Sequence, residues 1–193
     1  MRRIGLPVDQ LPDETLLSGL DGGDEEITVA FVRRFQRKVY GVALAVLGDP
    51  RLAEDVAQQA FERAWRHAHT YDPRRGSVSA WLTTIARNLA IDTARTHRAQ
   101  PVDPDELLLR IGLSAEGPER SALAHESADE LRAALHRLPR EQARAVVLAG
   151  IVGLSASQVA AAEGIPVGTA KSRIRTAMGR LRTTLASEHS DHD

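Results

Sequence analysis

A chain of 193 residues has room for one medium domain or two small ones, and we expect two small ones. Hydrophobic residues make up 42% of the chain and aromatic residues only 4%, while alanine, leucine and arginine are abundant, which favours an all-helical protein. The absence of cysteine excludes disulfides, thiolate zinc sites and thiol redox sensing by this chain. No run approaches the roughly 20 consecutive apolar residues of a membrane span, and the first residues lack the apolar core of a signal peptide. We therefore expect a cytoplasmic protein without membrane insertion.

The net charge of −1 conceals an uneven distribution along the chain. Seven acidic residues stand against two arginines in 1–30, and seven arginines stand against two acidic residues in 63–98. Eight acidic residues then stand against two arginines in 100–130, and nine basic residues against two acidic ones in 132–182. Clustered basic charge is typical of a surface that contacts a polyanion, whereas an ordinary solvated helix face is the alternative interpretation.

The chain divides at the stretch 99–122, which contains three prolines, two glycines and an excess of acidic residues. This composition breaks helical periodicity and predicts a flexible acidic linker. It separates a first domain at 31–98 from a second at 123–188. An acidic N-terminal segment at 1–30 and a short tail at 189–193 complete the chain.

Three helices are predicted in the first domain. Apolar residues recur at three- and four-residue spacings over 31–46, and Gly48 with the next two residues ends this run. A second apolar stripe runs through 51–65, with Phe61 and Trp65 beside it. After the turn-rich segment 69–77, a third helix is predicted over about 79–98.

The second domain begins with two predicted helices. Ser127 and Glu130 form a capping-box pattern ahead of an apolar stripe, which predicts that a helix starts there and that Pro139 interrupts it. A further helix is predicted over about 140–149.

A helix-turn-helix follows in the sequence. Ser155 and Gln158 repeat the capping-box pattern, so a short helix is predicted over 156–163, and Gly164 supplies the left-handed residue that ends it. A longer helix then begins near residue 167. In this motif the second helix enters the major groove of DNA.

The outward face of that second helix carries small hydroxyls and cations. Hydroxyls can approach phosphates and base edges, and arginine can pair bidentately with guanine. An amphipathic helix with a solvated basic face is the alternative. The candidate DNA-reading residues are Thr169, Lys171, Ser172, Arg173, Arg175 and Thr176.

A second candidate surface lies on the third helix of the first domain and in the turn before it. An aromatic, an amide and arginines on one face suit stacking on unpaired bases and holding their backbone. In the alternative, Trp81 belongs to the core and Asn88 forms a local hydrogen-bonded pair with Asp92. The candidate residues are Arg74, Arg75, Trp81, Asn88, Asp92 and Arg95.

Three segments together resemble a known family. AEDVAQQAFERAW at 53–65, WLTTIARNLAIDTAR at 81–95 and LSASQVAAAEGIPVGTAKSRIRTAMGRLR at 154–182 are similar to signature segments of the extracytoplasmic-function sigma factors, in that family's order. The resemblance covers about 31–98 and 127–186.

The resemblance implies an all-α protein with two small helical domains, a sigma region 2-like bundle and a sigma region 4-like helix-turn-helix domain. The first domain would bind and open the −10 element of a promoter, with Asn88 near the extruded base, Trp81 beside the duplex edge and the 69–77 turn holding that base. The second domain would read the −35 element. The implied function is that of an alternative sigma factor, which directs transcription initiation and is not an enzyme.

The resemblance also implies partners. These are promoter DNA, core RNA polymerase through the clamp helices of its largest subunit and through its flap region, and an anti-sigma factor. No metal, cofactor or catalytic residue of its own is expected. The residues that match the clamp-binding face are Glu54, Asp55, Gln58 and Gln59.

Four positions depart from the family pattern. Gln59 stands where glutamate is usual and Ala57 where a larger aliphatic is common, which leaves the strength of clamp docking open. Glu163 and Ala170 replace the commoner aliphatics of the helix-turn-helix core, so a looser second domain is expected.

Two rival functions follow from the same residues. A free-standing helix-turn-helix regulator would bind DNA without core polymerase. A metalloenzyme would use His67 and His69, or His189 and His192 of the tail, but histidines two residues apart do not share a helix face.

Overall fold

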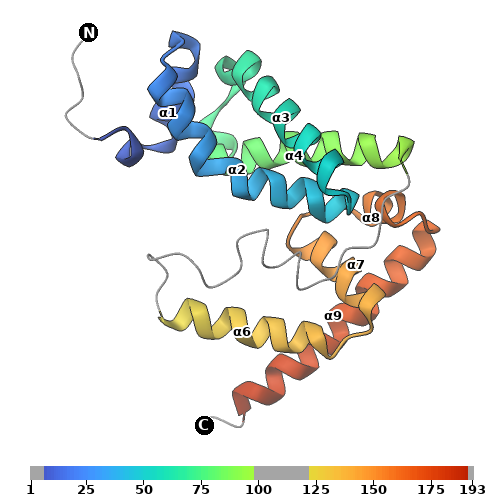
Figure 1. Ribbon diagram of the computed structural model, residues 1–193. Helices are drawn as coiled ribbons and strands as arrows, with labels where there is room; N and C mark the ends of the chain where they lie inside the picture. The colour runs from blue at the N-terminus through green and yellow to red at the C-terminus, as the bar shows by residue number, and fades with distance from the viewer. Residues whose placement is uncertain (1–6, 98–121, 191–193) are drawn as a thin grey trace.

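A computed structural model describes residues 7–97 and 122–190 (Figure 1). Within these ranges the chain forms eight α-helices and four short 3-10 helices and no β-strand, so the predicted all-α fold is confirmed. Helices α1 to α4 pack together as one group and α6 to α9 as another (Figure 1). The predicted linker lies outside the described residues except for Ala122.

Helix α2 (Glu25–Leu47) is the centre of the first group. The Asp24 carboxylate caps it by accepting hydrogen bonds from the backbone N–H groups of Glu26 and Ile27, and Gly48, with φ of 71°, ends it. The helix begins six residues before the predicted apolar stripe. The whole stripe is buried, as predicted, at Phe31, Phe35, Val39, Val42 and Val46.

Helices α3 (Pro50–His67) and α4 (Val78–Thr96) pack against α2 and against each other. The side chain of Asp49 caps α3 and that of Ser77 caps α4. Their buried faces consist largely of small or medium side chains, which let the helices approach closely. These residues include Val56, Ala60 and Ala64 of α3 and Leu82, Ala86 and Leu89 of α4.

The acidic N-terminal segment packs onto this bundle. Helix α1 (Asp13–Gly19) contacts α2 and α4, and the four leucines between residues 11 and 20 are buried. The guanidinium group of Arg34, on α2, donates hydrogen bonds to the backbone carbonyls of Leu11 and Asp9 and to the Asp13 carboxylate. Residues 9–20 therefore share the core of the first group.

The second group contains α6 (Ala122–His136), α7 (Arg140–Gly150), α8 (Ala156–Glu163) and α9 (Val167–Ser190). The capping box predicted for α8 is confirmed: the Ser155 hydroxyl accepts from the N–H of Gln158, and the Ser155 N–H donates to the Gln158 side chain. Gly164 ends α8 with φ of 63°.

The capping box predicted at Ser127 and Glu130 is wrong. Helix α6 already begins at Ala122, so Ser127 lies inside the helix. Residues 122–126 include two alanines, a leucine and a glutamate, which are strong helix formers and extend the helix towards the N-terminus.

Glu163, one of the departures from the family pattern, has a buried partner. Its carboxylate, 10% exposed, accepts a hydrogen bond from the Nε of Arg144, which is 3% exposed. The ion pair joins α8 to α7. A charged residue in place of an aliphatic one is therefore compensated by a cation on the neighbouring helix.

The main contact between the two groups joins α4 to α8 (Figure 1). The Arg87 guanidinium of α4 donates a hydrogen bond of 3.1 Å to the Gly153 carbonyl, in the turn before α8. Gly153 has a φ of 78°, which favours glycine, and a Cβ added there would lie 3.0 Å from the Arg87 Nη1.

Replacing Arg144 by alanine should destabilise the second group by about 3–5 kcal/mol, because it leaves the Glu163 carboxylate buried without its cation. The double replacement Arg144→Met with Glu163→Leu should restore most of this loss. Urea unfolding followed by circular dichroism measures both. Arg140→Ala, an exposed change in the same helix, is the control, and an Arg144→Ala protein as stable as this control would contradict the prediction.

Candidate nucleic-acid interface

The N-terminal half of α9 presents an open face to solvent. Ala170 and Ala177 are fully buried against the rest of the group, which turns the opposite side of the helix outward. Most of the predicted DNA-reading residues are on that side or flank it. Lys171, Ser172, Arg175 and Thr176 are exposed, while Thr169 and Arg173 are half-buried.

The cations of this face are available to a ligand. Lys171, Arg173 and Arg175 form no ion pair with any residue that the structure describes. Arg180, two turns after Arg173, instead donates a hydrogen bond of 3.2 Å to the Gln142 side chain and ties α9 to α7. The unpaired cations can therefore meet a phosphate or a base edge without first breaking an ion pair.

The exposed side of α4 forms the second face. Asn88, Asp92 and Arg95 are exposed and Trp81 is half-buried. The Asp92 carboxylate pairs with Arg95 at 3.3 Å, and Asn88 makes no hydrogen bond within the described chain, so an Asn88–Asp92 pair is not formed. The Asn88 amide is free to bind a ligand.

The loop before α4 is held in a defined shape. It contains η3 (Ala68–Thr70) and η4 (Pro73–Arg75). The Asp72 carboxylate accepts hydrogen bonds from both the backbone and the side chain of Arg74, and these bonds hold the pKa of Asp72 below its usual value. Arg74 and Arg75 remain exposed beside the start of α4.

The structure thus groups these residues in two sets. Arg74 and Arg75 lie in the loop, and Trp81 lies in the first turn of α4, which follows it. Asn88 follows about 10 Å further along the helix axis, at roughly 1.5 Å per residue, and Asp92 lies one turn beyond it.

The predicted clamp-binding residues are all exposed on α3. Gln58 donates a hydrogen bond of 3.3 Å to the Glu62 carboxylate one turn later. A shallow groove between α2 and α3 borders this face, with Glu54, Gln58 and Phe61 on one side and Tyr40 on the other.

Trp65 is the residue that the sequence analysis missed. It is 51% exposed, although its neighbours in the sequence suggested a place beside the core. On α3 it follows Phe61 by four residues and Gln58 by seven, which puts it on the same face as the predicted clamp-binding residues. The signal in the sequence is that the line ending at Ala64 already fills the buried side, so the next residue points about 100° away from it.

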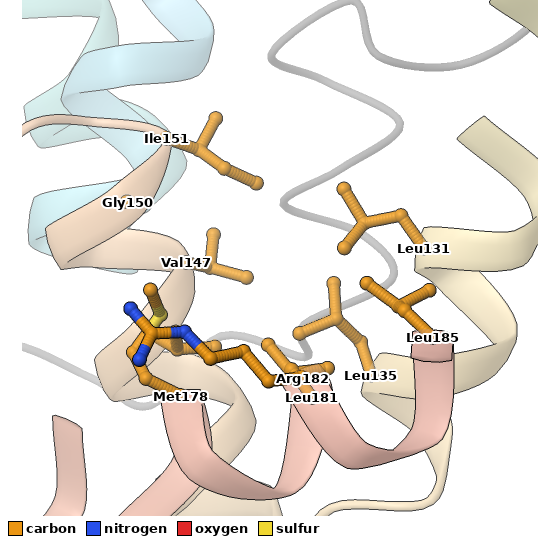
Figure 2. Close-up of a pocket in the computed structure, with 10 residues that line it drawn as sticks. Leu131, Leu135, Val147, Gly150, Ile151, Met178, Leu181, Arg182 and Leu185 are labelled. Atoms are coloured by element: carbon orange, nitrogen blue, oxygen red, sulfur yellow. The ribbon is translucent and has the colours of Figure 1, made fainter. Parts of the chain in front are cut away.

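The second group carries an apolar groove between α6, α7 and α9, shown in Figure 2. Aliphatic side chains of all three helices face a common space of about 270 Å³, and Met178 at its edge is 38% exposed. Arg182 is the charged residue of this lining. The groove is lined mainly by Leu131, Leu135, Val146, Val147, Ile151, Met178, Leu181 and Leu185.

Among residues 7–97 and 122–190, no helix is long and apolar enough to cross a membrane. No group of three or more histidine, cysteine, aspartate or glutamate side chains within these ranges could hold a metal ion. The His67 and His69 rings lie 6.3 Å apart, and His192 of the tail lies outside the described residues.

Comparisons with known proteins agree on one family. Residues 31–100 match the family description Sigma-70 region 2, and residues 128–181 match Sigma-70, region 4. The chain is 36% identical over 162 residues to the ECF RNA polymerase sigma factor RpoE of Cereibacter sphaeroides, covering 84% of this chain and 88% of that protein. It is 31% identical over 171 residues to the ECF RNA polymerase sigma factor SigW of Bacillus subtilis, covering 84% and 91%.

A solved structure, that of Rhodobacter sphaeroides SigE in complex with the anti-sigma ChrR, is 30% identical to this chain. The match covers 91% of this chain and 99% of that one, with a TM-score of 0.42. Both halves of the chain, the order of its two helical groups and the identity to these relatives show that the protein belongs to the ECF sigma factors of the sigma-70 family.

Proposed function

We propose that this protein is an alternative sigma factor that directs RNA polymerase to promoters by reading the −35 element with α9 and the −10 element with α4 and its preceding loop. The observation that supports this function is that each helical group of an ECF-family chain exposes one of the two faces that carry the candidate DNA-binding residues. The protein would act in the cytoplasm, without a cofactor.

At the −35 element, α9 would act as a recognition helix in the major groove. Ser172 and Thr176 are small enough for the helix to approach the base edges, and Arg173 can reach a guanine. Lys171 and Arg175 flank this centre and suit phosphate contacts, which fix the register of the helix on the duplex.

The −10 contact suits unpaired bases. The free amide of Asn88 offers a donor and an acceptor to the edge of an extruded base, and Trp81 offers a ring face. Stacking on an aromatic side chain contributes about 1–3 kcal/mol per base, which offsets part of the cost of unpairing. Arg74 and Arg75 are placed to hold the displaced backbone.

Two surfaces are proposed to dock on core polymerase. The acid and amide face of α3, extended by Trp65, suits the basic helices of a clamp. The apolar groove between α6, α7 and α9 suits an apolar helix of the flap region, since it is open, lined by aliphatic side chains and bordered by a single cation. The polymerase then supplies the chemistry and its magnesium, and this chain supplies no catalytic group.

The contact between α4 and α8 has to open during this process. Elements at −35 and −10 lie about 25 base pairs apart, or about 85 Å of duplex at roughly 3.4 Å per base pair. Because α8 packs against both α4 and α9, this contact holds the two proposed reading helices, α4 and α9, too close together to occupy both elements at once. Docking on two separate points of the polymerase would hold the groups apart and raise their effective concentration at the two elements.

An anti-sigma factor is a proposed regulator. The SigE structure named above is a complex with the anti-sigma ChrR. By analogy, such a partner would cover one or both polymerase-binding surfaces of this chain, and it would carry the sensing function that a chain without cysteine cannot supply through thiols.

Run-off transcription with core polymerase and a genomic promoter library should give specific initiation that either Asn88→Ala or Arg173→Ala weakens. The arginine change should cost about 1–3 kcal/mol and relax specificity at one −35 base. Thr96→Ala and Thr183→Ala, exposed in the later parts of the same two helices, are controls. Binding to duplex DNA alone, with neither core binding nor initiation, would favour the free-standing regulator.

Trp65→Ala should weaken core polymerase binding by about 2 kcal/mol or more, roughly 30-fold, because buried tryptophans dominate many interfaces. Met178→Asp should weaken it independently by placing a charge in the apolar groove. Fluorescence titration with core polymerase measures both affinities. Val29→Ala removes a comparably exposed apolar side chain from α2 and is the control, and equal affinities for all three variants would refute both docking surfaces.

Labels on Thr96→Cys and Ser157→Cys should report the opening of the α4–α8 contact, since both positions are exposed and the chain has no cysteine of its own. Energy transfer between the labels should be high in the free protein and fall when core polymerase is added. A pair within the first group, Thr28→Cys with Thr96→Cys, should not change. Unchanged transfer in the first pair would show that the groups stay together.

A further inference from the structure

Tyr71 connects the two ends of the loop that precedes α4. Its phenol hydroxyl donates a hydrogen bond of 2.9 Å to the backbone carbonyl of Gly76. The bond spans five residues and encloses η4. No residue of η4 is buried, so the bond fixes the shape of an exposed loop rather than joining two parts of the core.

The acceptor of this bond has an unusual backbone conformation. Gly76 has a φ of 136°, which residues other than glycine rarely adopt. A Cβ added there would meet only the Ala80 Cβ, at 3.9 Å, so the backbone angle and not a lack of space calls for glycine. This conformation sets the direction of the carbonyl that Tyr71 binds.

The ring of Tyr71 also contacts Trp81. The two ring centroids lie 5.8 Å apart, with 65° between the ring planes, which is an edge-to-face arrangement. Trp81 is half-buried in the first turn of α4. One side chain therefore closes the loop and supports the aromatic ring at its exit.

Helix α1 packs against both sides of the Tyr71 loop, since it contacts η3 before the loop and α4 after it. Burial raises the pKa of Tyr71, and so do the nearby carboxylates of Glu14 and Asp13. The phenol therefore keeps its proton at neutral pH and remains a donor. This gives the acidic N-terminal segment a role next to the loop.

We propose that Tyr71 is a positioning residue for base capture at −10: it holds the 71–76 loop and the ring of Trp81 in the geometry that receives the extruded base. The proposal rests on the −10 function proposed above.

The test compares Tyr71→Phe, which removes only the hydroxyl, with the wild-type protein bound to core polymerase. The probe is the single-stranded non-template −10 segment of a promoter recovered by the transcription assay, together with a series in which each base in turn is replaced by an abasic site. The position whose loss weakens wild-type binding most is the captured base.

Tyr71→Phe should bind the intact strand about 2- to 10-fold more weakly, the range for one lost hydrogen bond, while its affinity for core polymerase is unchanged. On the strand that lacks the captured base, Tyr71→Phe and wild type should bind equally, since the residue acts through that base. Thr28→Val removes a hydroxyl that bonds a backbone carbonyl far from the loop, and it should bind both strands as wild type does.

Equal binding of the intact strand by Tyr71→Phe and wild type would overturn the proposal. An equal loss on the intact and abasic strands would also overturn it, because the defect would then not act through the base. If no abasic position weakens the wild-type complex and Asn88→Ala binds normally, the −10 function itself fails, which is a different result from either of these.

Discussion

Close packing of helices through small side chains is the constraint on which both proposed nucleic-acid faces depend. In the first group, Ala60 and Ala64 of α3 and Ala86 of α4 have no exposed surface. In the second group, Ala170 and Ala177 of α9 are also fully buried. Interiors are packed as densely as organic crystals, so a larger side chain at any of these positions would displace a helix and with it the face on its other side. The buried alanines therefore fix the positions of the two proposed reading surfaces, and Ala170, which departs from the family pattern, is one of them.

Packing through small side chains also explains where the few aromatic residues lie. The three phenylalanines cluster inside the first group, where the Phe31 ring lies 4.9 Å from Phe35 and 6.2 Å from Phe61. Both tryptophans retain exposed surface. Aliphatic and small side chains complete the core, and they leave Trp65 and Trp81 partly exposed, as the proposed contacts with a protein partner and with bases require. The arginines also differ in whether they have a carboxylate partner. The buried Arg144 and the half-buried Arg34 have carboxylate partners, whereas the arginines of the proposed α9 reading face have none within the described chain.

Local features of the sequence predict most of the helices and much of the site. The apolar stripes predict α2, α3 and α4, and the capping box at Ser155 predicts where α8 begins, because these signals come from residues within one or two turns of each other. The failures involve residues that are distant in the sequence or signals that compete. The partner of Glu163 is Arg144, on another helix, and an arginine in an amphipathic segment is normally assigned to the surface. The capping-box pattern at Ser127 does not mark a helix start, because the helix formers on its N-terminal side extend α6 to Ala122. Trp65 was misplaced because hydrophobicity alone does not distinguish a core residue from one that awaits a partner.

The arrangement of the surfaces also constrains the order of events at a promoter. Neither proposed polymerase-binding surface includes α8, so core polymerase can engage α3 and the groove while α4 and α8 still touch. The contact that it would have to break includes the hydrogen bond from Arg87 to Gly153, which contributes about 0.5–1.5 kcal/mol net, together with the packing of α4 on α8. A well-packed docking surface can supply more than this. In the proposed mechanism, polymerase binding at the two docking surfaces supplies the free energy that separates α4 from α8, and the contact between these helices keeps the free protein from spanning a promoter.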